Sequence, residues 1–108
     1  MLPSQIMSEL AELTQLNRKG VDALYEAESE LAEAEHKLDT IESKAFLEAQ
    51  GTVADRQALA RLEAADARLE RDLARARVNR VKTKIRVIES EVMAVATRAK
   101  MMQAEMKL

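Results

Sequence analysis

Apolar residues recur along the first half of the chain at spacings that alternate between three and four residues, and this periodicity constrains the fold most strongly. The alternation is not interrupted anywhere in the series, although an asparagine and a glycine occupy two of its early positions. Such a strict alternation is the heptad pattern of a helix that packs along its length against another helix. The residues of this predicted seam are Leu10, Leu13, Asn17, Gly20, Leu24, Ala27, Leu31, Ala34, Leu38, Ile41 and Ala45.

A second series of the same period occupies the last third of the chain. Leu59, Leu62, Leu69 and Leu73 precede it and join it only through a four-residue step. An inserted step of this kind is a stutter, which locally unwinds the supercoil of two helices. We therefore predict a stutter near residues 73–81. The residues of the later seam are Val78, Val81, Ile85, Ile88, Val92, Val95, Ala99, Met102 and Met106.

The turn between the two helices is predicted at Gly51 and Thr52. Glycine suits the left-handed position that closes a helix. Thr52 can cap the next helix, and Asp55 follows at the capping-box position. A two-residue connection forces the helices to run antiparallel. The sequence therefore predicts an all-α fold, a long, coiled-coil-like antiparallel helical hairpin.

A second break is predicted between Asn17 and Gly20, with Asp22 as the cap of the following helix. Glycine inside a helix costs about 1 kcal/mol relative to alanine, and here it lies beside a polar seam position. The expected result is a single helical domain over residues 1–108, with a short N-terminal helix. Its helices are expected at about 4–17, 22–50 and 53–106.

Several apolar residues fall outside the two seams, and we interpret them as an oligomer interface. Aromatic residues make up only 2% of the chain, so aliphatic stripes supply most of the buried surface. Apolar residues left over on a small helical protein usually mark self-association. A homodimer or higher oligomer, such as a bundle of two hairpins, is expected. The predicted interface residues are Leu16, Phe46, Leu47, Val87, Met93 and Met101.

The polar residues give no pattern that indicates catalysis. The chain has no cysteine, so thiolate metal sites and cysteine nucleophiles are excluded. The single histidine, His36, falls on the polar face, with Ser29 and Ser43 each a full heptad away, which is too far for a nucleophile–base pair. We predict a protein that is not an enzyme, with no cofactor and no metal site. No apolar run approaches the length of a membrane span, so we expect a cytoplasmic protein.

Charge is distributed unevenly along the chain. Residues 1–55 carry four Lys/Arg against twelve Asp/Glu, whereas residues 56–108 carry thirteen against seven. If Gly51 lies opposite Thr52, residue i faces residue 103 − i, and the acidic half then neutralises much of the basic half.

That facing rule leaves one group of basic side chains without nearby carboxylates. Arg75 and Arg77 would face Glu28 and Glu26. Six other basic residues converge on one level with a single acid, Asp22, nearby, which favours either a solvated face or an anion-binding patch. Tyr25 could add a stacking surface. The predicted patch consists of Arg18, Lys19, Tyr25, Arg80, Lys82, Lys84 and Arg86.

Parts of the chain resemble a family of small helical proteins encoded by tailed bacteriophages. The similarity lies in Lys44-Ala45-Phe46-Leu47, in Gly51-Thr52-Val53 with Arg56, and in Ile85-Arg86-Val87-Ile88-Glu89. It begins with the stretch from Tyr25 through Arg56, continues in the Ile85–Glu89 segment, and covers about two-thirds of the chain. The resemblance implies a phage-encoded accessory protein of the host cytoplasm, whose genes often lie among replication and recombination functions. It implies no active-site residues.

Three functional hypotheses follow from the sequence. The first is an oligomeric interaction module that binds and modulates a host or phage protein. The second is a nucleic-acid-binding accessory of recombination or replication, in which the basic patch contacts phosphates. The third is capture of a small anionic nucleotide signal between protomers. None of the three involves a membrane.

Overall fold

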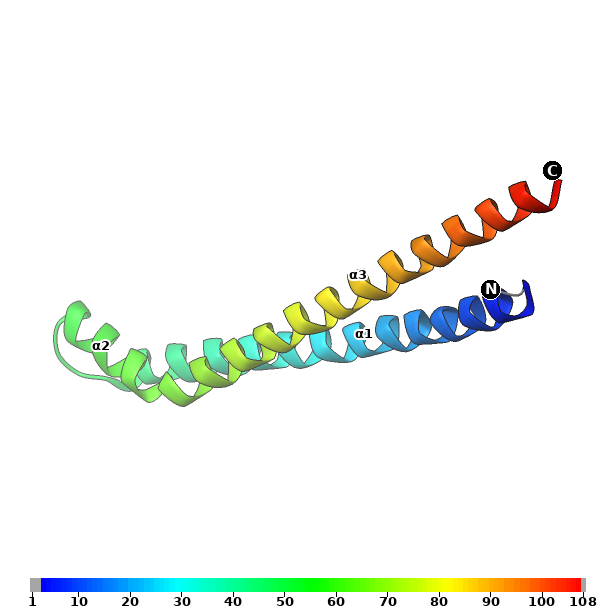
Figure 1. Ribbon diagram of the computed structural model, residues 1–108. Helices are drawn as coiled ribbons and strands as arrows, with labels where there is room; N and C mark the ends of the chain where they lie inside the picture. The colour runs from blue at the N-terminus through cyan, green and yellow to red at the C-terminus, as the bar shows by residue number, and fades with distance from the viewer. Residues whose placement is uncertain (1–2, 108) are drawn as a thin grey trace. The chain divides into compact units, whose positions relative to one another are not determined.

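The computed structural model describes residues 3–107 of the chain, and nearly all of this range is helical (Figure 1). Helix α1 runs over Pro3–Glu48, α2 over Val53–Glu63 and α3 over Ala65–Lys107. Within these described residues there is no β-strand. The prediction of an all-α fold is confirmed.

The contacts divide the chain into two compact units. One unit contains Tyr25–Asn79, and the other contains the chain up to Leu24 together with the chain from Arg80 onward. In the first, which we call the turn unit, α1 leads through the turn into α2 and the beginning of α3. In the second, the terminal unit, the N-terminal part of α1 packs against the C-terminal part of α3. The antiparallel hairpin is confirmed within each unit, whereas the single domain stays a prediction.

The turn has the predicted cap but a longer connection. Gly51 adopts a positive φ of 113°, which only glycine adopts without strain. The Asp55 backbone N–H donates to Thr52 Oγ1 at 3.1 Å, and the Thr52 N–H donates to Asp55 Oδ2 at 3.3 Å. This is the expected capping box. The connection between α1 and α2 is residues 49–52, four residues rather than two.

The prediction of a break at Asn17 and Gly20 is wrong, because α1 is continuous from Pro3 to Glu48 and Asp22 caps nothing. Gly20 instead marks a close approach of two helices. A Cβ built on Gly20 would lie 2.9 Å from Ile85 Cγ1 in α3, closer than two carbon atoms can pack. The side-chain Oδ1 of Asn17 is buried without a hydrogen-bond partner among the described residues. Both residues therefore belong to the packed seam.

The predicted seam of α1 is confirmed along its whole length. Every residue assigned to it, from Leu10 to Ala45, is buried or partly buried. Ile6 extends it by one position at the N-terminal end and is 5% exposed. In α3 the predicted seam from Val78 to Met102 is likewise buried or partly buried. Met106 is the exception and is exposed.

The predicted seam of α2 and early α3 is wrong. Its four leucines are all exposed, and the predicted stutter near residues 73–81 is absent. Alanines lie inside instead: Ala60, Ala64 and Ala67 are at most 5% exposed. Small side chains allow two helix backbones to approach closely. The seam runs in unbroken heptads through Ala60, Ala64, Ala67, Arg71, Ala74, Val78, Val81, Ile85, Ile88, Val92, Val95, Ala99 and Met102.

The boundary between α2 and α3 at Ala64 leaves this periodicity intact. The Ala64 N–H donates to the Ala60 carbonyl at 3.0 Å, and the Arg68 N–H donates to the Ala64 carbonyl at 2.9 Å. Both bonds have the four-residue spacing of an α-helix. The Ala64 backbone itself departs from helical dihedral angles and caps α2 (φ −89°, ψ 4°), so α2 and α3 are separate helices that keep one heptad order.

Candidate functional site

Five interhelical ion pairs fix which sides of α1 and α3 meet. Seam residues occupy heptad positions a and d, so positions e and g border the seam and positions b, c and f face outward. Each of the five pairs joins g to g or e to e, as an antiparallel arrangement requires. They are Lys37–Glu70 at 2.9 Å, Arg98–Glu9 at 3.0 Å, Arg75–Glu35 at 3.8 Å, Arg68–Glu42 at 3.9 Å, and Arg77–Glu30.

The facing rule predicted from the turn is wrong by two residues. Gly20 lies against Ile85, so residue i lies opposite residue 105 − i. The cause lies in the turn, because the four-residue connection does not place Gly51 opposite Thr52. Arg75 and Arg77 form their ion pairs with Glu35 and Glu30 rather than with the predicted Glu28 and Glu26. Both pairs run diagonally across the seam, because Glu35 and Glu30 lie five and two residues beyond the positions directly opposite.

The six predicted basic residues lie in the terminal unit on two different flanks of its helix pair. Lys82 takes position e and Lys84 position g, on opposite sides of the seam. The other four take outward positions b and c. One flank consequently holds Arg18, Lys82 and Arg86, and the other holds Lys19, Arg80 and Lys84.

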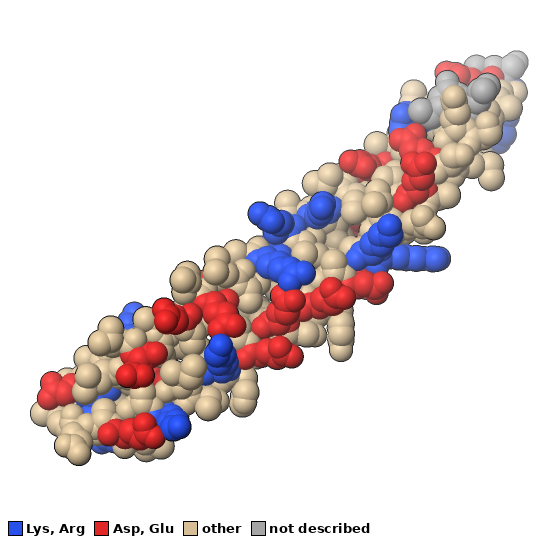
Figure 2. Space-filling model, turned by 90° about the horizontal axis from the view of Figure 1, so that it is seen from below, with Lys and Arg blue, Asp and Glu red and all other residues tan. Residues whose placement is uncertain are grey.

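This division corrects the prediction of a single patch. Tyr25, the seventh predicted residue, belongs to the turn unit, where its side chain is 74% exposed. Figure 2 shows Lys and Arg side chains gathered on the face that it presents. In the described part of the chain, none of the six forms an ion pair with a carboxylate. The terminal unit carries nine Lys/Arg against six Asp/Glu, so it has a net positive charge.

No protein-family model, curated protein or solved structure matches the chain. The resemblance to phage proteins therefore stays a prediction.

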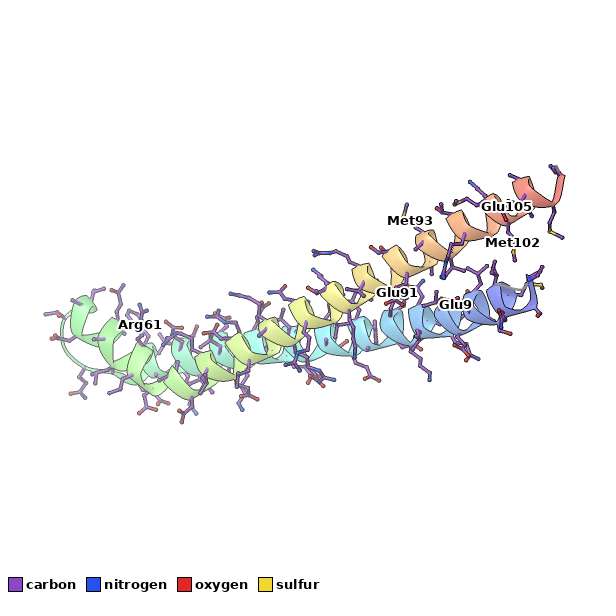
Figure 3. All side chains as sticks on the ribbon, in the orientation of Figure 1. Glu9, Arg61, Glu91, Met93, Met102 and Glu105 are labelled. Atoms are coloured by element: carbon purple, nitrogen blue, oxygen red, sulfur yellow. The ribbon has the colours of Figure 1, made fainter. Side chains whose placement is uncertain are left out.

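The exposed apolar residues of α2 and α3 lie mainly on the outward face. Of the predicted interface residues, Val87 and Met101 take position c and Met93 takes position b; all three are at least half exposed. Figure 3 shows Met93 on the side of α3 that points away from α1, whereas Met102 points toward α1.

The predicted interface residues of α1 differ from one another. Leu16 and Leu47 are 46% and 75% exposed. Phe46 is partly covered, because the Arg56 guanidinium lies 4.3 Å from its ring centroid and donates two hydrogen bonds to its carbonyl. Phe46 therefore has a local role at the turn.

Four exposed leucines of the turn unit are the surface that the sequence did not identify. Their exposed fractions are 47% for Leu59, 73% for Leu62, 59% for Leu69 and 63% for Leu73. All four take outward positions c and f, opposite the alanine seam. Extending the later seam backwards from Val78 in unbroken heptads would have revealed this face, since it reaches the alanines.

His36 and a groove of paired charges are two further polar features within residues 3–107. His36 is exposed on α1. Among residues 3–107, no three His, Asp or Glu side chains lie close enough to share a metal ion. A groove in the turn unit is lined by Glu30, Lys37, Glu70 and Arg77, whose charges already pair with one another.

A second groove lies in the terminal unit between the ends of α1 and α3. Its lining is mainly apolar and includes Ile6, Leu10, Met102 and Met106. Nowhere in the described chain is a helix long and apolar enough to cross a membrane.

Proposed function

We propose that this chain is a non-enzymatic helical interaction module, which associates with itself and binds a protein partner through the outward faces of its hairpin. The observation that carries the proposal is the series of large apolar side chains at outward heptad positions, above all the four leucines of the turn unit. These side chains lie outside the buried seam, although Leu59 and Leu73 also line grooves beside α1. Large exposed apolar patches on proteins are typical of interaction surfaces.

The outward face of α3 in the terminal unit is the proposed surface for the partner. Met93 and Met101 are 70% and 61% exposed, and Val87 lies on the same outward face. Methionine side chains are flexible and polarizable, so they adapt to partners of different shape. The resemblance stated above places this partner among host or phage proteins.

Capture from a cell lysate tests the partner surface. We expect the full chain to recover one protein in stoichiometric amount, with or without nuclease treatment. The double variant Met93→Lys with Met101→Lys should recover about ten times less of it, which corresponds to a loss of about 1.4 kcal/mol in binding free energy. A matched control is Ala11→Lys with Gln15→Lys, at exposed positions of α1 in the same unit. Equal recovery by the methionine variant and the control would contradict this use of the surface.

Anion binding is a second candidate, supported by the basic side chains that lack carboxylate partners. Arg80 and Lys84 are one helical turn apart on one flank, and Lys82 and Arg86 are one turn apart on the other. Pairs with this spacing can contact neighbouring phosphates of a nucleic acid or of a nucleotide. Such binding would weaken steeply with salt, since each phosphate contact releases a counterion.

Salt-dependent binding to single-stranded DNA and heparin tests this candidate. We expect Arg80→Glu with Lys84→Glu to reduce the slope of log K against log salt by about 1.5, because about 0.7 is lost per contact on a single strand. Lys100→Glu with Lys107→Glu makes the same charge change farther along α3, beyond the six basic residues, and should leave more of the slope intact. Thermal stabilisation by nucleotides without DNA binding would instead indicate a small ligand. If neither DNA nor nucleotides bind, the anion candidate fails.

A further inference from the structure

The outward leucines of the turn unit form a stripe with its own heptad period. Successive stripe residues are three, four, three, four and three positions apart, which is the spacing of a helix–helix seam. The stripe lies outside the buried seam, because its members take positions c and f of the heptads that pack on α1. Leu59 and Leu73, at position c, also border α1. We call this set the outer stripe: Leu59, Leu62, Asp66, Leu69, Leu73 and Ala76.

We propose that a second copy of this chain covers the outer stripe, with its own α2 and α3 lying antiparallel on it. The inference rests on the proposed function and assigns this one surface to self-association. The period of the stripe matches that of a helix–helix seam, and the stripe runs from α2 into α3 past Ala64, which caps α2. Two hairpins would then pack back to back through identical surfaces, the usual arrangement of a twofold dimer.

The charges along the stripe determine the orientation. In a parallel pair each outer-stripe residue meets its own copy, so Asp66 would face Asp66 of the second copy inside an apolar seam. Two carboxylates in that environment repel strongly. In an antiparallel pair Asp66 lies opposite an apolar residue, close to the border of the seam where water reaches it. The antiparallel orientation is therefore favoured.

Antiparallel registers that alternate heptad positions correctly differ by seven residues, and only one of them pairs all six outer-stripe residues with one another. The charges also favour this register over the one shifted by a heptad toward the turn. In the favoured register, Glu63 lies opposite Arg77 of the second copy and Leu62 lies opposite Leu73 of the second copy. The other register brings Glu63 opposite Glu70 and places two arginines opposite each other. Opposite charges across a seam determine pairing and register in coiled coils. The first register is the complementary one.

The same register places the two copies of Glu70 near the twofold axis. Each Glu70 carboxylate already accepts a hydrogen bond from Lys37 of its own chain at 2.9 Å. That ammonium group neutralises the carboxylate on both sides of the axis. The repulsion between the two Glu70 side chains is therefore small. Because these side chains meet at the twofold axis, residue 70 is a position at which the dimer can be cross-linked.

Solution mass tests the occupant. By light scattering at about 100 µM, we expect the full chain to have about twice the 12.1 kDa mass of one chain. The double variant Leu62→Lys with Leu73→Lys should have the mass of one chain. Leu47→Lys, at a residue of the same unit that is 75% exposed, should leave the larger mass. Helix content by circular dichroism checks that each variant folds. A single-chain mass for the unmodified protein would overturn self-association and leave another protein as the occupant.

Cross-linking of single-cysteine variants tests the register, independently of any folding defect in the lysine variants. The chain has no native cysteine, so every thiol is the introduced one. With a short bismaleimide we expect Glu70→Cys to form covalent dimers at least ten times faster than Ala65→Cys or Leu69→Cys. If Leu69→Cys reacts fastest, the two helices run parallel. If Ala65→Cys reacts fastest, the helices are antiparallel in the register that places Glu63 opposite Glu70 of the second copy. Either result would overturn the proposed arrangement. The capture experiment with the methionine variants does not depend on this result, so the two proposals can fail separately.

Discussion

Replacing Ala64 with leucine is expected to lower the free energy of unfolding by about 2–3 kcal/mol, although leucine is the more hydrophobic residue. Ala64 is completely buried and packs with Leu38 and Ala67, and Ile41 lies against this cluster. No space remains for three additional carbon atoms unless the helices separate. Overpacking of this kind forces side chains out of their preferred rotamers and shifts the backbone. The loss would be measured by urea unfolding, followed through the helix signal.

The adjacent residue provides the matched control. Ala65 is exposed, so Ala65→Leu makes the same change in composition and should alter the free energy of unfolding by less than about 0.5 kcal/mol. Adding Ile41→Ala to Ala64→Leu should recover part of the loss, because it removes volume from the same cluster. Repeating the unfolding at several protein concentrations separates this effect from self-association, which makes stability concentration-dependent. Equal losses for Ala64→Leu and Ala65→Leu would show that Ala64 is not in the seam.

The contrast between α1 and α2 shows which part of the fold could be predicted from the sequence. In α1 only one apolar series has the heptad period, and the structure buries it. In α2 and early α3 two series compete, alanines at 60, 64 and 67 and leucines at 59, 62, 69 and 73. Hydrophobicity favours the leucines, whereas close approach of the backbones requires the alanines. The structure places the alanines inside and exposes the leucines, which is why no stutter is needed.

The basic residues show what a one-dimensional facing rule cannot predict. The rule placed Lys82 and Lys84 at the same level of the hairpin, and that level is confirmed to within two residues by the contact between Gly20 and Ile85. A level does not specify a side, however. Two residues along a helix rotate the side chain by about 200°, so these lysines lie on opposite flanks. Only the heptad register, which the exposed leucines had obscured, distinguishes the two flanks.

Replacing Gly20 with leucine is the second substitution with a large expected effect, a loss of about 2 kcal/mol in the free energy of unfolding. Helix propensity alone predicts the opposite sign, since glycine inside a helix is about 0.8–1 kcal/mol less favourable than alanine and leucine is nearly as good as alanine. The contact with α3 decides the outcome. The first carbon of any side chain at this position would lie 2.9 Å from Ile85 Cγ1, so either the Ile85 side chain or the helix must move. The sign of the change therefore distinguishes a packed glycine from a helix break.

A double-mutant cycle with Ile85→Ala tests whether that contact is the cause. Ile85→Ala alone removes a partly buried side chain and should cost about 2 kcal/mol or more. Combined with Gly20→Leu, it should cost clearly less than the two single losses together, with a coupling of about 1–2 kcal/mol, because the leucine fills the space that the isoleucine leaves. Additive losses would mean that Gly20 and Ile85 do not share a contact, and a more stable Gly20→Leu variant would mean that the helices are further apart at this level. Either outcome would also remove the facing rule of 105 − i from the terminal unit.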